Sequence, residues 1–442
     1  MPWRRAIGLA AVVVMGCGDD ANDSGWGGTE EVLANGARLV RNPAEGVRGG
    51  GAGSGWRLVE ELRVGRVEGG GPAEFGRIVG LEVDGTGRLW VVEGQSQELR
   101  VFDANGAHVR TVGGRGSGPG EFRSVGGLAW DGAGDLWVHD GQNGRYTRYD
   151  TAGTLRETQP RTTAAPPFGS WQGGIRDDGW LYDQDMLPLE GAAGVSGPTV
   201  PPLLAAAGIA SEDRTILRAM FDTDPSAASS GGEGEGGGAA AGEGTSERAG
   251  GDTVELPVQR TNLEPFSVEY ATERGRGTRF VGVPFAPRLH RLFDPRGYLW
   301  FGESDVYRIH QRRLEGDTLL IIERAYTRLP VRSAELDEWE AGVASFGEAG
   351  GRIDRSRIPS EKPVFDQLMV NDRGHLWVRL VGDGDEPVFD VFDAAGRYLG
   401  EVTGAAGLAL FPAPVIRGER FYSVVHDSLD VPWVVRYRIE GR

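Results

Sequence analysis

Residues 80–91 (GLEVDGTGRLWV) and 127–138 (GLAWDGAGDLWV) decide how this chain folds. In both, an alternating apolar segment ends in Asp, a glycine-bearing turn follows, and a second segment opens with Leu-Trp-Val. This pattern is typical of a β-hairpin, because Asp accepts hydrogen bonds from turn amides and Gly adopts a positive φ. Further copies are found at 292–301 (LFDPRGYLWF), 369–378 (MVNDRGHLWV) and, in weaker form, 175–182 and 416–423.

Further hairpins follow several of these copies and give each unit four antiparallel strands, the composition of a β-propeller blade. Such hairpins are found at 99–112, 146–157 and 391–402. The aromatic residue of the second strand recurs at Trp90, Trp137, Tyr182, Trp300, Trp377 and Tyr422. Once two inserts are allowed for, this spacing predicts an all-β fold: a six-bladed β-propeller with four-stranded antiparallel blades and one short helical insertion.

The first insert falls within one blade and just after it. Residues 216–222 and 254–258 are expected to be outer strands joined by the Gly/Ala/Ser/Glu tract 225–251, which is too polar to pack and is expected to be disordered. A strand pair near 266–272 and 278–283 is expected to precede the next blade.

The second insert, at about 331–358, is expected to be helical. Ser333 can cap a helix whose Leu336, Trp339, Val343 and Phe346 fall on one face. The last unit is short by one strand, while residues 56–67 form a spare strand before the first blade. We therefore predict that this amino-terminal strand completes the last blade, which removes two open sheet edges.

The amino terminus carries an export pattern. Arg4 and Arg5 precede the apolar run 6–16, which is too short to span a bilayer but fits the core of a signal peptide. The sequence V-M-G-C ending at Cys17 resembles the lipobox of bacterial lipoproteins. The resemblance implies cleavage after a signal peptide over 1–16 and lipidation of Cys17. The polar, Gly-rich composition that follows predicts a flexible tether over 17–55, which leads to the propeller at 56–442. A plain secretory signal with a chance cysteine is the alternative.

The stretch 115–149 resembles an NHL repeat through G-x-G-P-G-E-F, G-L-A-x-D, G-x-L-W-V and D-x-x-N-x-R. Residues 69–102 form a degenerate second copy. Together with the lipobox, the chain resembles the six-bladed β-propeller lipoproteins of bacteria. This resemblance implies a lipid-anchored protein of the cell envelope, on its periplasmic or cell-surface side.

Composition and motifs exclude several function classes. The chain has 64 acidic and 47 basic residues and a formal charge of −17, which disfavours nucleic acid as a partner. Cys17 is the sole cysteine, so the chain has neither an internal disulfide nor a thiolate metal cluster. We find no H-E-x-x-H, G-x-S-x-G or P-loop motif, and the six histidines lack metal-ligand spacing.

Carboxylates recur three residues after the ring aromatic in four units, at Glu93, Asp140, Asp185 and Glu303. They are expected to lie where each second strand ends, on one face of the propeller. There they form either a rim that binds a divalent cation or cationic ligand, or caps for the following turns, and we favour the caps. His139 and His426 are placed at similar points and are candidates for the same rim.

Lys362 is the only lysine and leads into the first strand of the fifth unit, near the predicted channel mouth. It is either a retained ammonium site or an accident of composition, and the second is favoured. The sequence thus predicts a membrane-anchored, monomeric binding or scaffold module for a protein, peptide or glycan. The alternative is a metal-dependent lactonase, hydrolase or lyase with its site at the channel mouth.

Overall fold

The computed structural model describes residues 26–44, 46, 55–163, 170–187, 214–222, 253–261, 263–272, 275–314 and 316–441. The predicted signal peptide, Cys17 and the loop 225–251 lie outside these residues. Among the described residues, no helix is long and apolar enough to cross a membrane.

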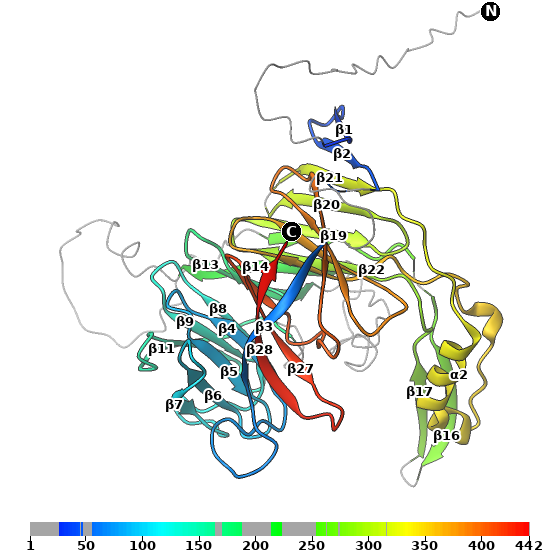
Figure 1. The fold of residues 1–442 in the computed structure, drawn as a ribbon. Helices are drawn as coiled ribbons and strands as arrows, with labels where there is room; N and C mark the ends of the chain where they lie inside the picture. The colour runs from blue at the N-terminus through cyan, green and yellow to red at the C-terminus, as the bar shows by residue number, and fades with distance from the viewer. Residues whose placement is uncertain are drawn as a thin grey trace, which may run out of the picture.

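Six units of antiparallel strands make up the body of the molecule (Figure 1). Blade one holds β4 (Ile78–Val83), β5 (Leu89–Glu93), β6 (Glu98–Phe102) and β7 (His108–Gly113). Blade two holds β8 (Val125–Trp130), β9 (Leu136–Asp140), β10 (Arg145–Tyr149) and β11 (Leu155–Pro160). Blade three holds β12 (Gly174–Ile175), β13 (Trp180–Leu187), β14 (Arg214–Asp222) and β15 (Thr253–Glu255).

The second half of the chain repeats the arrangement. Blade four holds β18 (Leu289–Asp294), β19 (Tyr298–Glu303), β20 (Arg308–Arg313) and β21 (Thr318–Arg324). Blade five holds β22 (Phe365–Val370), β23 (Leu376–Leu380), β24 (Val388–Phe392) and β25 (Tyr398–Thr403). Blade six holds β26 (Val415–Arg417), β27 (Arg420–His426) and β28 (Pro432–Glu440). These blades confirm the predicted all-β propeller.

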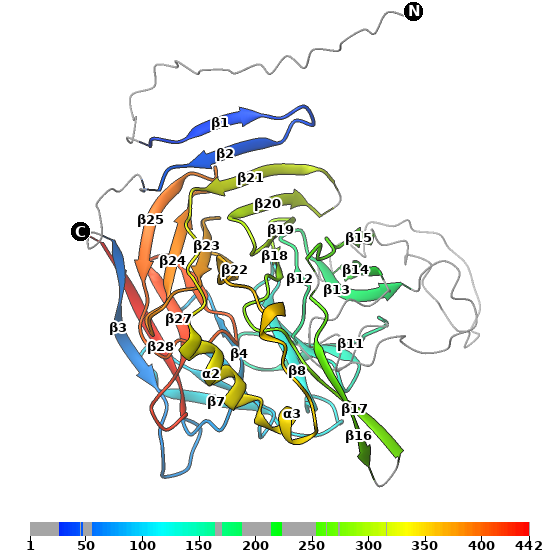
Figure 2. The same cartoon turned by 90° about the vertical axis from the view of Figure 1, so that its right-hand side faces the viewer.

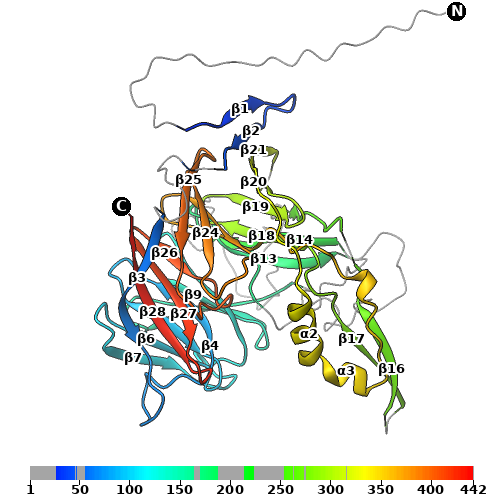
Figure 3. The ribbon, with the colours of Figure 1, turned by 45° about the vertical axis from the view of Figure 1, so that its right-hand side comes forward.

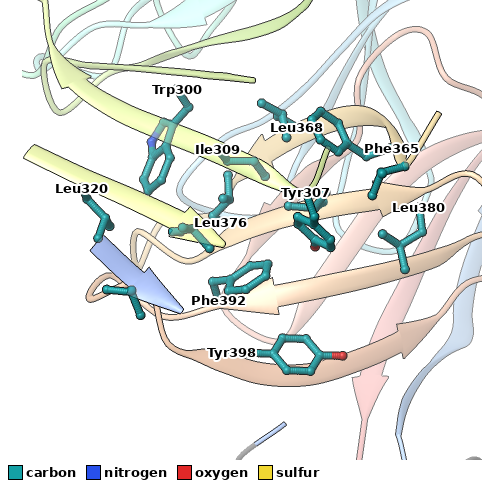
Figure 4. Close-up of a cluster of buried hydrophobic side chains, with 14 residues drawn as sticks. Trp300, Tyr307, Ile309, Leu320, Phe365, Leu368, Leu376, Leu380, Phe392 and Tyr398 are labelled. Carbon is teal, nitrogen blue, oxygen red and sulfur yellow. The ribbon is translucent and has the colours of Figure 1, made fainter. Parts of the chain in front are cut away.

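Buried hydrophobic clusters hold the blades together, one for each pair of neighbours from one–two to six–one. Figure 4 shows the cluster between blades four and five, where Trp300 and Ile309 of one blade face Phe365 and Leu376 of the next. Because every blade shares a core with both neighbours, the six sheets close into a ring.

Blade six is completed from the amino end of the chain, as predicted. β3 (Trp56–Val64) pairs antiparallel with β28 as the fourth strand. Val402 and Thr403 of β25 also pair with Trp56 and Arg57 in parallel, so β3 joins the outer edges of blades five and six.

Part of the segment predicted to be a flexible tether is instead folded onto the propeller. β1 (Thr29–Val32) and β2 (Arg38–Asn42) form a hairpin, and β2 pairs in parallel with β21 to extend blade four (Figure 2). Leu39 and Val40 are buried there. Burial of these side chains and pairing of the β21 edge explain why the segment docks.

The two inserts pack against each other beside the ring (Figure 3). β16 (Phe266–Thr272) and β17 (Gly275–Val281) form the expected hairpin, and α2 (Ser333–Gly342) and α3 (Ala344–Glu348) lie against it. Phe266 and Phe346 are buried between them, with Trp339 half-buried.

Two details of the helical prediction are wrong. The N-cap is Arg332 rather than Ser333, because the Glu335 carboxylate accepts the backbone N–H of Arg332 at 2.9 Å and fixes the start one residue earlier. The single helix is also divided at Val343, and a 3₁₀ turn (Arg355–Arg357) follows α3.

Candidate functional site

The carboxylates of the predicted rim serve as links between loops. Glu93 accepts backbone N–H groups of Gly76 (3.2 Å) and Arg77 (3.0 Å) with one oxygen, and that of Ser96 (2.6 Å) with the other. Asp140 makes the same kind of link in blade two, from Arg123 (3.0 Å), Ser124 (2.9 Å) and Asn143 (3.4 Å). Each therefore ties the loop entering the first strand to the turn leaving the second.

The other two carboxylates are also buried. Glu303 accepts the backbone N–H of Arg260 and, at 3.3 Å, the hydroxyl of Thr261, and Asp185 is buried at 4% exposure. In the described part of the chain, no three His, Cys, Asp or Glu side chains gather as a metal ion would require. The contacts of Glu93, Asp140 and Glu303 fit the turn-capping interpretation.

His139 lies at the boundary of blades two and three. Its ring stacks on Trp171 at 5.7 Å, and its Nε2 is 3.9 Å from Asp183 Oδ2. Burial lowers the pKa of His139 to about 4 despite the nearby carboxylate, so the ring is neutral at pH 7. Asp183 accepts the Tyr146 hydroxyl and the Arg161 Nε, each at 2.6 Å, so this is a lock between blades.

His426 is not part of such a cluster. It ends β27 and donates its backbone N–H to the carbonyl of Gly407 at 3.1 Å. Among the described residues, His139 and His426 have no recorded contact partner in common.

Lys362 is a buried bridge. Its Nζ donates to Glu335 of α2 and to Asp383 of blade five, each at 2.5 Å. Burial alone would lower the pKa of Lys362, but the hydrogen bonds to the two carboxylates hold the pKa above its ordinary value. Lys362 thus links the helical insert to blade five. The next residue, Pro363, lines a pocket.

That pocket, about 220 Å³ in volume, opens between the first strands of blades four and five. Its walls are largely apolar, and its polar lining residues are Arg288, His290, Ser304 and Asp366. The segment that follows β17 forms one wall, where Phe285 adopts φ +55°. A non-glycine residue in this conformation stores strain, a feature common at functional sites.

Asp366 reaches the pocket through a β-bulge. Phe365 pairs with Leu380 and Gln367 with Arg379, which leaves Asp366 as the extra residue of β22. Blades one and two have the same bulge with Val79 and Gly126 at this point. Bulges re-aim side chains, and only the bulge of blade five, among these three, carries a charge.

One carboxylate oxygen of Asp366 is a hydrogen-bond acceptor without a donor among the described residues. Its Oδ1 is buried with no hydrogen-bond partner among the described residues, and Arg379 Nε approaches no closer than 3.8 Å. Burial raises the pKa of Asp366 to about 6, although Arg379 opposes the shift. The carboxylate is therefore largely ionised at pH 7 in an apolar pocket.

His290 faces the same pocket, with its ring 5.4 Å from that of Phe365. Burial, with Arg288 nearby, lowers the pKa of His290 to about 4, so the ring is neutral at pH 7. One anionic acceptor and one neutral ring within apolar walls, with the exposed Arg288 as the cation of the lining, can hold an apolar group that ends in an N–H donor.

Sequence reasoning missed Asp366 and His290. When the repeats are aligned on the turn Asp or Asn, Asp366 stands where Val79 and Gly126 occur in blades one and two. The unusual Asp at this repeat position could be seen in the sequence. The β-bulge and the pocket wall around it could be seen only in the structure.

Comparison with known proteins addresses the fold. Residues 71–159 match the model of a family described as "6-bladed beta-propeller", and this range overlaps the sharpest repeats. A search of curated protein sequences found no match.

The solved structures that resemble the chain are distant. A DUF4221 family member from Bacteroides vulgatus is 8% identical, with 88% of this chain and 99% of that chain covered and a TM-score of 0.46. Virginiamycin B lyase from Staphylococcus aureus is 10% identical, with 87% of this chain and 100% of that chain covered and a TM-score of 0.39. A gluconolactonase from Xanthomonas campestris is 12% identical, with 82% of this chain and 88% of that chain covered and a TM-score of 0.37. By its six interlocked blades and the family match, the chain is a six-bladed β-propeller protein.

Proposed function

We propose that the protein is a monomeric, extracytoplasmic binding module, anchored to a membrane through lipidated Cys17, that takes a protein or peptide at the pocket between blades four and five. The observation that carries the binding function is the Oδ1 atom of Asp366, which is buried beside apolar walls and accepts no hydrogen bond among the described residues, while the side chain as a whole is 31% exposed. A buried acceptor left without a partner costs about 1–3 kcal/mol, which a ligand donor recovers on binding.

The pocket accommodates a single side chain rather than a whole small molecule. Val283, Phe285 and Phe365 favour an aliphatic stem, and Asp366 favours an ammonium or guanidinium at its tip. A lysine or arginine side chain of a partner meets both requirements, because its methylene stem packs on apolar surface while its head stays charged.

Binding is tested with a library of peptides displayed against the purified chain. We expect enrichment of peptides with a basic residue and at least a tenfold loss of their affinity in Asp366→Asn, measured by isothermal titration calorimetry. Asp385→Asn, at an exposed site of the same blade, should bind like the wild type. Equal affinity in the Asp366→Asn variant, selective binding of glycans instead, or conversion of the bound peptide to products would overturn the proposal.

The anchor is tested separately by fractionation of cells that express the full chain. Wild-type protein should sediment with membranes and yield an acylated amino-terminal peptide by mass spectrometry. Cys17→Ser should release the protein into the soluble extracytoplasmic fraction. An unmodified Cys17 in the wild type would contradict the anchor but leave the pocket unaffected.

A further inference from the structure

The hairpins between first and second strands share one set of side-chain hydrogen bonds. In blades one, two and four, one carboxylate oxygen of the turn Asp accepts backbone N–H groups of the turn. The other accepts the indole Nε1–H of the ring tryptophan. The second contact measures 3.2 Å for Asp84–Trp90, 3.0 Å for Asp131–Trp137 and 3.0 Å for Asp294–Trp300.

Blade five has Asn371 in place of the turn Asp, so one carboxylate oxygen is replaced by an amide nitrogen. Asn371 Oδ1 accepts the backbone N–H groups of Arg373 (3.0 Å) and His375 (2.8 Å), as the Asp does elsewhere. Its amide nitrogen therefore takes the place of the second carboxylate oxygen, and a nitrogen that carries hydrogens cannot accept from Trp377. Trp377 is 2% exposed, and its Nε1 has no partner among the described residues.

This unsatisfied hairpin borders a second pocket, about 930 Å³ in volume, between blades five and six. Asn371, His375 and Trp377 line it from blade five. The ends of β3 and β28 line it from the other side. The cavity and the Asp366 pocket lie at opposite ends of β22, so they are separate sites.

The cavity also contains positive charge that is not fully neutralised. Arg57 and Arg438 line it and share the Glu440 carboxylate, Arg438 also lies 4.0 Å from Glu61, and Glu419 is the second acidic residue of the lining. The side chain of Arg373 lines it too and has no acidic partner among the described residues. By contrast, Arg88 and Arg296 in the equivalent turns pair with their turn Asp at 2.6 and 2.7 Å. The change from Asp to Asn therefore removes a negative charge as well as an acceptor.

We propose that this cavity binds an organic carboxylate, which supplies the negative charge that Asn371 lacks. The ligand carboxylate would take hydrogen bonds from the Asn371 amide and the Arg373 guanidinium, close to the buried donor of Trp377. Val391, Leu399 and Ile439 provide an apolar wall for the body of the ligand. Charge-assisted bonds of this kind are among the stronger polar contacts in proteins.

The test uses phenylacetate as the probe and the full chain as the protein. We expect saturable binding by isothermal titration calorimetry and at least a tenfold loss of affinity in Asn371→Asp. That variant places a fixed carboxylate in the cavity and restores the acceptor for Trp377, so its melting temperature should rise above that of the wild type.

Asp131→Asn is the matched control, because it makes the same exchange in blade two, away from the cavity. It should lower the melting temperature and leave phenylacetate affinity unchanged. Three results would overturn the proposal: no saturable binding, unchanged affinity in Asn371→Asp, or equally tight binding of inorganic phosphate. Asp366→Asn should not alter phenylacetate binding, so this test is independent of the peptide pocket.

Discussion

At the scale of single residues, the turn aspartates do more than permit a reversal of the chain. Asp131 Oδ1 accepts from the backbone of Ala133 and Asp135, while Oδ2 accepts from Trp137 in the core. Gly134 supplies the positive φ of 84° that the turn requires. One side chain thus fixes both the hairpin and the rotamer of the largest buried ring in its blade.

We therefore expect Asp131→Asn to cost about 1–3 kcal/mol of unfolding free energy, because Trp137 loses its buried acceptor. Arg148, whose Nε is 3.4 Å from Asp131 Oδ2, loses a nearby charge as well. Urea denaturation followed by tryptophan fluorescence measures the loss. Asp385→Asn, an exposed change, should have no comparable effect. Equal midpoints for the two variants would contradict this role.

His139 gives the fold a dependence on acidity. Its pKa is about 4 when folded and about 6.5 in an exposed histidine. Between these values the unfolded chain binds the proton more strongly, so stability falls as pH falls from about 6.5 to about 4. The His139 contribution lost by pH 5 is about 2 kcal/mol.

Replacement of His139 by Gln should remove that portion of the pH dependence, measured as the difference between urea midpoints at pH 7 and pH 5. His108→Gln, at an exposed site, should retain the wild-type difference. If both variants lose stability on acidification as the wild type does, His139 is not the responsible group.

At the scale of elements, the ring is closed by a strand from the far end of the chain. Val64 of β3 is buried with Val424 and Val434 in the cluster between blades one and six. Without β3, β28 would present an open edge, and this cluster would lose one of its walls.

A chain that begins at residue 66 should therefore melt about 10 °C or more below one that begins at residue 47. Calorimetry measures the difference, and light scattering should show association through the free edge of β28. The chain from residue 47 controls for loss of the β1–β2 hairpin. Equal melting temperatures would show that β3 is dispensable.

At the scale of the whole molecule, Asn42 connects three parts of the chain. Its Oδ1 accepts from the Tyr398 backbone at 2.7 Å, and its Nδ2 donates to the carbonyls of Glu323 (3.2 Å) and Gly396 (3.0 Å). The hairpin, blade four and blade five therefore meet at one amide. The hairpin of β1 and β2 is thereby held on the ring.

Asn42→Ala should cost about 2–3 kcal/mol, because buried backbone groups of blade five and the β21 edge lose their partners. It should also free the hairpin, which limited trypsin digestion would show as faster cleavage after Arg38 and Arg41. Asn35→Ala, in the exposed hairpin turn, is the control and should digest at the wild-type rate. Unchanged cleavage in Asn42→Ala would mean that strand pairing alone holds the segment.

The blades were predictable because their signals are local. Asp131, Gly134 and Trp137 lie within seven residues of one another, and blades one and four repeat the pattern with Asp84, Gly87 and Trp90 and with Asp294, Gly297 and Trp300. Within the tether, residues 32–40 are strand-like in sequence, but the docking of β2 was not predictable, because only the folded ring presents the edge of β21. The candidate site was missed for the same reason: the pocket around Asp366 and His290 joins segments whose proximity no spacing in the sequence reveals.

By itself, the sequence determined the hairpins, the number of blades and the strand that closes the ring, because these follow from apolar periodicity and turn chemistry that recur along the chain. The tertiary structure alone decided that Lys362 is a bridge, and that Asp366 Oδ1 and Trp377 Nε1, each beside a pocket, have no hydrogen-bond partner among the described residues. Those properties depend on burial and on partners from other blades. Burial sets the free-energy cost of a polar group without a hydrogen bond, and therefore the gain when a ligand supplies one.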